Sequence, residues 1–271
     1  MVTTDAVPAA TGENFRLRRA AAVAEQQAML LRGRGYWWLM LSGFVEPVFY
    51  LFAVGWGIGS IVGDVPLPSG ESIPYLTFVA PALLAVSTMN GAIIEAGVNF
   101  FIKITGMKIY NAVLNTPVTP VDIAYGELAW SMVRGIIYGG VFLAMMVAMR
   151  LTEPQMALLA LPAMLLVGFA FGGLGLVVAT VMRTFADYDY VAMVQTALFL
   201  FSGTFVPITT YPPAVQVLVH LTPLYRGVEL LRGITLGHFS WILLRDVVYL
   251  VALATAGLAI SSRRLVRRFR V

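Results

Sequence analysis

Cysteine is absent from this chain of 271 residues, and histidine and lysine occur only twice each. Without cysteine there is no disulfide framework, no redox pair and no thiolate metal site. Charge is scarce as well: Asp, Glu, Lys and Arg make up only 12% of the sequence, whereas they form about a quarter of a typical soluble domain. Hydrophobic residues make up 59%. This composition excludes an ordinary soluble domain and indicates an integral membrane protein.

The shortage of lysine also bears on nucleotide binding. A phosphate-binding loop of the form GxxxxGK needs Ser or Thr after its lysine, yet Lys103 and Lys108 are each followed by isoleucine. The glycine-rich string Gly55–Gly63 lies at the end of an apolar run and not between a strand and a helix, so its small residues are better explained by close helix packing. The same interpretation covers Gly135/Gly139 and Gly168/Gly172. We therefore expect no cofactor in this chain and no catalytic or metal site.

Six apolar segments are long enough to cross a membrane, which takes roughly 20 residues in a helix. They are continuously apolar, whereas the strands of a membrane barrel alternate over segments of about 10 residues. The six segments are Trp37–Gly59, Leu76–Val98, Ile123–Ala148, Met156–Val181, Tyr190–Val206 and Trp241–Ser261. The sequence therefore predicts an all-α membrane fold with six transmembrane helices and both termini on one side.

The distribution of basic residues predicts which side this is, because cytoplasmic loops carry an excess of Lys and Arg. The connector Ser60–Tyr75 has Asp64 and Glu71 but no basic residue. The basic residues cluster at both termini and in the connectors of the same side: Arg16, Arg18, Arg19, Arg32, Arg34, Lys103, Lys108, Arg183, Arg263, Arg264, Arg267, Arg268 and Arg270. We expect both termini in the cytoplasm of a bacterial cell, with the basic residues facing the anionic inner leaflet and no nucleic acid as a partner.

The N-terminal part before the first span has two sections. Residues 1–12 are small and polar and lack the features of a signal peptide, so a disordered tail is expected there. Residues 13–35 can form a helix with arginines on one face, which favours a position in the cytoplasmic membrane interface; a solvated helix or disordered tail is the alternative. The transmembrane domain would then span residues 36–262, followed by a basic cytoplasmic tail, 263–271.

The region 207–238 is apolar but broken by several prolines and glycines. A straight span does not tolerate so many interruptions, and irregular backbone at membrane depth must be buried in protein or line a watery cavity. We expect a pair of short re-entrant helices before the last span; the alternative is an amphipathic loop on the outer surface. The residues expected to shape this re-entrant gate are Gly203, Pro207, Pro212, Pro213, Pro223 and Arg226.

Two charges are expected deep in the membrane. Glu46 in the first span and Arg134 in the third each lie about ten residues from the inner surface, roughly 15–17 Å at ~1.5 Å per residue. A central charge is costly unless it is paired, so the sequence predicts a Glu46–Arg134 ion pair, with direct substrate contact as the alternative. Glu95 and Glu127 lie near the cytoplasmic ends of their helices, where water, Lys103 or Lys108 would face them.

Several strings together resemble the permease subunits of the ABC-2 exporter family, most of all the nodulation-factor (lipo-chitooligosaccharide) exporter permeases. The likeness covers nearly the whole chain after the N-terminal tail. The strings are EPVFYLFAVGWGIGSIVG at Glu46–Gly63, YLTFVAPALLA at Tyr75–Ala85, NTPVTPVDIAYGELAW at Asn115–Trp130, DYDYV at Asp187–Val191, FSGTFVPITTYPP at Phe201–Pro213 and TPLYRGVELLRGITLGH at Thr222–His238.

The resemblance implies a half-transporter with a type V ABC exporter-like fold. It would pair with a second permease copy, as a homodimer or heterodimer, and with two copies of an ABC ATPase subunit that holds the ATP and magnesium. The connector between spans two and three would carry a coupling helix at about Met107–Leu114. Coupling to the ATPase would involve Lys108, Tyr110, Asn111, Leu114, Thr116 and Pro117. The chain departs from the family at Ala82, where glycine is common after the proline, and at Asn111, where an acidic residue is usual.

The expected function is export of an amphipathic substrate, such as a glycolipid, a lipid-linked saccharide or a hydrophobic drug, through the bilayer. A proton or ion path needs buried titratable residues in series, and only Glu46 and Arg134 are expected deep. A secondary transporter for a hydrophobic compound is one alternative. Such transporters ordinarily have interrupted helices at matching positions in two halves of the chain, whereas here the interruptions lie only near the fifth and sixth spans. A lipid-handling membrane protein without an ATPase partner is the other.

Overall fold

The structure is a computed structural model that describes residues 49–66, 70, 72–107, 110 and 113–269. Several predictions lie outside these residues: the tail 1–12, the helix 13–35, the first part of the first span and Glu46. Lys108 and Asn111 of the expected coupling helix lie outside them as well.

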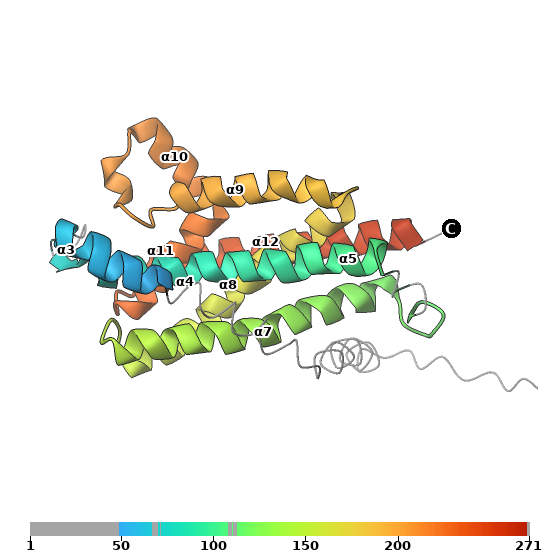
Figure 1. Cartoon of the computed structure of the whole chain (residues 1–271), viewed down its shortest axis with the longest axis horizontal. Coiled ribbons are helices and arrows are strands. Elements are labelled where there is room, and N and C mark those ends of the chain that lie inside the picture. The colour runs from blue at the N-terminus through green and yellow to red at the C-terminus, as the bar shows by residue number, and fades with distance from the viewer. Residues whose placement is uncertain (1–48, 67–69, 71, 108–109, 111–112, 270–271) are drawn as a thin grey trace, which may run out of the picture.

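Four of the described helices are long and apolar enough to cross a membrane. The first is a continuous helix of 31 residues made of α4 (Tyr75–Ile93), the π-helix η2 (Ile94–Asn99) and α5 (Phe100–Thr105). The others are α7 (Pro120–Ala148), α8 (Pro154–Val181) and α12 (Trp241–Phe269). Together with α9 they run along the long axis of the molecule (Figure 1). The predicted all-α membrane fold is confirmed at this level.

Proline determines where many of these helices begin. Its fixed φ suits the first helical turn, where its missing N–H costs nothing, and it stands at the start of α7, α8, α10 and α11. At α7 the hydroxyl of Thr119 accepts a hydrogen bond from the backbone N–H of Asp122, and the Asp122 carboxylate accepts one from the backbone N–H of Thr119. This reciprocal cap starts α7 before Ile123, where the apolar run begins.

The fifth predicted span is shorter than expected. Helix α9 (Tyr188–Leu200) has 13 residues and covers about 20 Å at ~1.5 Å per residue, against the roughly 30 Å of a hydrocarbon core. The chain leaves the helix at Phe201 and turns at Gly203, which has a φ of 67°. In the first span, the described residues Phe49–Val62 are helical and include η1 (Ala53–Ile58) and α3 (Gly59–Val62). Six full spans are therefore not confirmed.

The first connector forms a small hairpin that the sequence did not predict. Helix α3 ends at Gly63, whose φ of 71° is one that glycine adopts without strain. Strands β1 (Asp64–Pro66) and β2 (Ser72–Pro74) then pair antiparallel, and α4 follows directly.

Between α9 and α12 lie the short helices expected in region 207–238. They are η4 (Ile208–Thr210), α10 (Pro213–Leu221) and α11 (Pro223–Thr235). Helix α10 stands away from the long helices, whereas α11 runs back among them (Figure 1). Their depth in the bilayer stays a prediction. At the C-terminus α12 continues past Ser261 to Phe269, so most of the basic segment 263–271 is helical.

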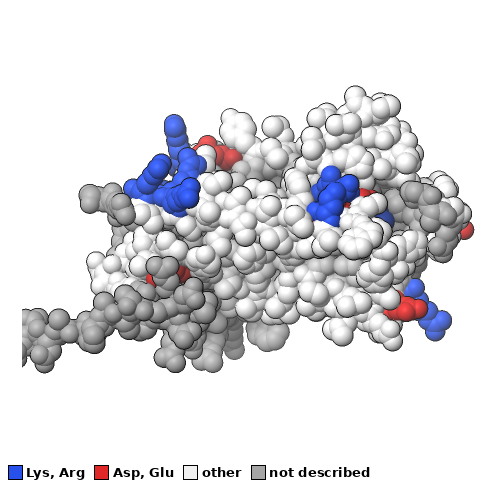
Figure 2. All heavy atoms as spheres, turned by 180° about the vertical axis from the view of Figure 1, so that it is seen from behind, with Lys and Arg blue, Asp and Glu red and all other residues white. Residues whose placement is uncertain are grey.

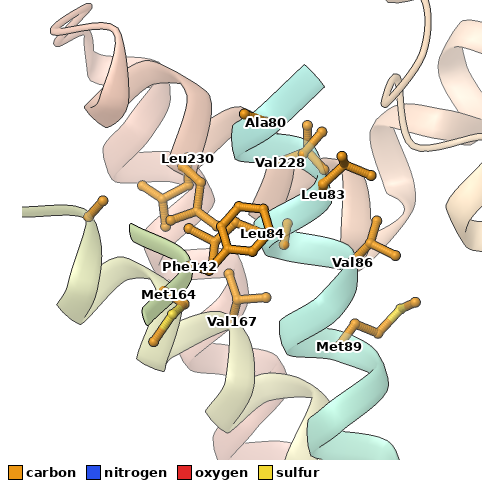
Figure 3. Close-up of a cluster of buried hydrophobic side chains, with 14 of the residues drawn as sticks. Ala80, Leu83, Leu84, Val86, Met89, Phe142, Met164, Val167, Val228 and Leu230 are labelled. Atoms are coloured by element: carbon orange, nitrogen blue, oxygen red, sulfur yellow. The ribbon is translucent and has the colours of Figure 1, made fainter. Parts of the chain in front are cut away.

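Helix α8 lies at the centre of the packing and contacts α4, α7, α11 and α12. Leu84, Phe142, Val167 and Val228 converge from α4, α7, α8 and α11 respectively (Figure 3). Glycine allows close approach between helices: a Cβ built on Gly257 of α12 would lie 2.7 Å from the carbonyl carbon of Gly173. The predicted small-residue packing is also present at Gly55, Gly139, Gly168 and Gly172, each of which has a neighbouring side chain where a Cβ would go. It is not seen at Gly63, where a Cβ would meet no described atom within 4 Å, and Gly135 has only a distant neighbour, Leu165 at 4.0 Å.

The two ends of the molecule differ in charge. Basic residues gather where the C-terminus lies (Figure 2), and the exposed arginines there are Arg263, Arg264, Arg267 and Arg268. We call this the basic end and the opposite one, which carries β1 and β2, the hairpin end. Asp187, in the turn between α8 and α9, also belongs to the basic end: the backbone N–H groups of Arg183 and Thr184 donate to its carboxylate and hold its pKa below the ordinary value.

Candidate functional site

A cavity of about 670 Å³ lies between α4, η2, α7, α8 and α9. We call it the central cavity. One part of its wall is apolar and includes Leu83, Phe142, Met164, Phe199 and Leu200. The other part carries polar side chains, namely Ser87, Thr88, Asn90, Glu95, Asn99, Ser131, Arg134, Tyr138, Gln195 and Thr196. A cavity with both kinds of surface can hold a ligand that is itself part apolar and part polar.

Glu95 and Arg134 face each other in this wall. The Arg134 guanidinium donates to the Glu95 carboxylate, and the exposed fractions of the two side chains are only 14% and 7%. Glu95 was expected to face water or a lysine, and that expectation is wrong. The predicted partner of Arg134, Glu46, is outside the described residues, so the predicted pair stays a prediction.

The π-helix η2 carries Glu95. A π-turn widens a helix locally and is frequent at functional sites. Here Asn99 Nδ2 donates to Glu95 Oε2 over 2.8 Å within the same π-helix, and Arg134 Nη2 donates to the Tyr138 hydroxyl over 3.2 Å. The two charges are therefore held by neighbours on their own helices, and they are the only charged side chains among the described residues of the cavity wall.

A pair of amides closes another side of the central cavity. Gln195 of α9 donates from Nε2 to Asn90 Oδ1 of α4 over 2.9 Å. Gln195 is 7% exposed, and its Oε1 accepts no hydrogen bond within the described part of the chain. Sequence reasoning missed this pair, although two amides inside apolar spans could have been flagged as residues that need a partner.

A second polar cluster lies at the basic end, and we call Lys103, Tyr110 and Glu127 the connector cluster. Glu127 is completely buried, and Lys103 Nζ lies 2.8 Å from its Oε2. The hydroxyl of Tyr110 donates to Oε1 of the same carboxylate. The predicted contact between Glu127 and Lys103 is confirmed.

The expected coupling residues divide into two groups where they are described. Tyr110 is only 2% exposed and packs edge-on against Phe100, with ring centroids 5.6 Å apart. Thr116 and Pro117 are exposed and Leu114 is half-buried. Tyr110 points inward to Glu127, and coupling of these residues to the ATPase stays a prediction.

The residues of the predicted gate lie at the ends of the short helices. Gly203 forms the turn after α9, Pro207 precedes η4, Pro212 and Pro213 start α10 and Pro223 starts α11. Arg226 of α11 pairs with Asp246 of α12, Nη1 to Oδ1 at 3.0 Å. A gating role for these residues stays a prediction.

Two polar contacts in this region were missed. Asp246 is fully buried in the protein. Arg232 donates to the carbonyl oxygens of Phe78 (3.1 Å) and Gly203 (2.9 Å), and its guanidinium carbon lies 3.8 Å from the centre of the Phe78 ring. Buried arginines in a chain with so few charges were a signal that such partners must exist.

Within the described residues no group of three or more His, Asp or Glu side chains could hold a metal ion. The family described as ABC-2 type transporter matches residues 23–236. The chain belongs to this family.

Two relatives illustrate the breadth of the similarity. The chain is 34% identical over 198 residues to Nodulation protein J of Sinorhizobium fredii (strain NBRC 101917 / NGR234), which covers 71% of this chain and 72% of that protein. It is 26% identical over 194 residues to the Inner membrane transport permease YadH of Escherichia coli (strain K12), covering 69% of this chain and 72% of that protein. The resemblance inferred from the sequence is confirmed at the level of the family.

Proposed function

We propose that this chain is the transmembrane permease subunit of an ATP-driven exporter that moves an amphipathic substrate out across the bacterial cytoplasmic membrane. Membership of the ABC-2 type transporter family is the observation that carries this proposal. The chain has no phosphate-binding loop around Lys103 or Lys108, so ATP and magnesium would bind in a separate ATPase subunit. Two ATPase copies and a second permease copy would complete the transporter.

The basic end would face the cytoplasm and place both termini there. Arg263, Arg264, Arg267 and Arg268 of α12 would then meet the anionic inner leaflet. The connector segment around Leu114, Thr116 and Pro117 would be available to the ATPase. The short helices α10 and α11 would lie in the outer leaflet. Exposed Val217, Leu218 and Leu221 on α10 support this position, because apolar side chains on a short helix favour the membrane interface.

The lining of the central cavity supports an amphipathic substrate with an uncharged polar part. The charges of Glu95 and Arg134 cancel, so the described residues of the cavity wall offer no net charge to a cation or an anion. Gln195 Oε1 is an acceptor that a ligand hydroxyl or amide N–H could satisfy. A glycolipid or a lipid-linked saccharide carries such groups beside an apolar tail.

The first experiment measures ATP hydrolysis by the purified chain in lipid, alone and with an ATPase subunit encoded next to it. The chain alone should hydrolyse no ATP, and the complex should do so at a rate that an amphipathic substrate increases. Hydrolysis that tracks the isolated chain would contradict the proposal, and so would a chain that transports without any ATPase.

The second experiment tests the substrate part of the proposal with Gln195→Met. This change keeps the length of the side chain and removes the amide, so transport of a hydroxyl-rich amphiphile should fall about fivefold or more, the effect of one buried hydrogen bond. Gln216→Met is the matched control, because the Gln216 amide donates to the Tyr211 carbonyl away from the cavity. Equal transport by the two variants would exclude the amide pair from substrate binding.

A further inference from the structure

The connector cluster joins three segments through one carboxylate. Glu127 of α7 accepts hydrogen bonds from Lys103 of α5 and from Tyr110 of the connector between these helices. Glu127 is 0% exposed and the Lys103 side chain 14%. Loss of Lys103 would leave the buried carboxylate with an uncompensated charge, and loss of the Tyr110 hydroxyl would remove one of its hydrogen-bond donors. The three segments are therefore held to one another as long as the carboxylate keeps both partners.

A second ion pair lies further along the same two helices with its charges reversed. The helix from α4 to α5 supplies Lys103 and Glu95, and α7 supplies Glu127 and Arg134 as their partners. The two residues on each helix are about two turns apart at ~3.6 residues per turn. Sliding one helix past the other would bring like charges together, so the two pairs hold the helices in one register.

This arrangement also reaches the central cavity, because Arg134 and Glu95 belong to its wall. The Tyr110 hydroxyl connects the connector to Glu127 of α7, and α7 also carries Arg134. Tyr110 itself is buried against Phe100.

We propose that the Tyr110 hydroxyl is a positioning group that attaches the connector to α7 through Glu127. As a result, the connector and the parts of α5 and α7 that lie at the basic end move as one body. The inference rests on the proposed function, since it states how an ATPase acting on the connector changes the cavity wall. The sequence suggested instead that Tyr110 contacts the ATPase.

The first test examines the joint in the chain itself and needs no ATPase. The chain contains no cysteine, so spin labels can be attached specifically to Asn115→Cys on the connector and Tyr125→Cys on α7, both of which are exposed. Pulsed electron spin resonance in lipid should give a narrow distance distribution that broadens clearly with Tyr110→Phe. This variant keeps the ring and removes only the hydroxyl.

Tyr188→Phe is the matched control. Tyr188 is half-buried at the basic end and packs against the same hydrophobic cluster as Tyr110, and its hydroxyl makes no hydrogen bond within the described residues. The control should leave the distance distribution unchanged. Equal distributions for the wild type and Tyr110→Phe, or broadening by both tyrosine variants, would overturn the inference.

The second test uses the complex with the ATPase and measures substrate transported per ATP hydrolysed. Tyr110→Phe should keep assembly and hydrolysis but lower this ratio at least about fivefold. Glu127→Gln should lower it similarly, and the double variant should be no worse than either single one, because both changes break the same joint. Loss of assembly, or an unchanged ratio, would overturn the inference. If the wild-type complex hydrolysed no ATP, only the proposed function would be contradicted. The spin-label test of the joint needs no ATPase and would still stand.

Discussion

Arg134 shows how a single residue depends on its surroundings. A guanidinium in an apolar helix must find a carboxylate, and its position in the third span made Glu46 the expected partner. The structure brings Glu95 to it, from a π-helix that turns this side chain into the central cavity. The need for a partner was therefore predictable, whereas the identity of the described partner was not.

Glu95→Gln and Arg134→Gln should each lower the free energy of unfolding by about 3–5 kcal/mol, the cost of breaking a buried ion pair. The exchanged pair, Glu95→Arg with Arg134→Glu, should recover part of the loss. Thermal unfolding in detergent measures these effects, and Arg183→Gln, an exposed arginine, serves as the control with little change.

The same measurement on Glu46→Gln, alone and combined with Arg134→Gln, tests the original prediction. If the double variant loses less unfolding free energy than the two single variants together, Glu46 lies beside the described pair. Strictly additive losses for Glu95 and Arg134 would contradict the contact seen between them.

At the scale of helices, packing depends on where glycine allows two backbones to meet. Helices in membranes associate through small residues because lipid provides no hydrophobic driving force between them. Gly257 of α12 and Gly173 of α8 form such a contact, and Gly97 of η2 meets Gly175 of α8 in the same way. Helix α8 therefore holds both α12 and the π-helix that carries Glu95.

Gly257→Ala should lower stability by about 1–3 kcal/mol, the usual cost of overpacking, because its Cβ would lie 2.7 Å from the Gly173 backbone. Gly140→Ala is the same change in α7 at a position with no atom within 4 Å. It should be neutral or stabilise the helix by up to about 1 kcal/mol. Thermal unfolding of both variants gives the comparison, and an equal effect would mean that α8 and α12 do not approach closely.

For the whole molecule, the separation of charge predicts its orientation in the membrane. Arg263, Arg264, Arg267 and Arg268 are exposed near the C-terminal end of α12, and the β1–β2 hairpin lies at the opposite end of the molecule (Figures 1 and 2). The excess of positive charge belongs on the cytoplasmic side, so the hairpin should face outward.

Single cysteines in this cysteine-free chain measure the orientation directly. A membrane-impermeant maleimide should label Ser72→Cys, in the exposed part of β2, in intact cells and label Arg267→Cys only after the membrane is opened. Both positions are exposed in the structure. Labelling in the reverse order would invert the topology and contradict the proposed cytoplasmic position of the connector.

The sequence by itself determined the class of protein and most helix boundaries in the described part. The length of apolar runs, the placement of charge and the position of proline all act locally. Helices α7 and α8 therefore begin within a few residues of their predicted positions, and these two helices, like α10 and α11, begin at prolines. It overestimated α9, because apolar residues continue past Leu200 although the backbone turns at Gly203. Hydropathy measures transfer into lipid and does not report where a helix stops.

Only the tertiary structure decided which polar groups meet. Gln195 reaches Asn90 across 105 positions of sequence, and Arg134 reaches Glu95 across 39. The tertiary structure also shows that the Tyr110 hydroxyl contacts Glu127 and that Arg226 pairs with Asp246. These contacts depend on how each helix is rotated about its axis and where two helices cross. Both are set by the packing of many side chains at once, and no local pattern in the sequence contains them.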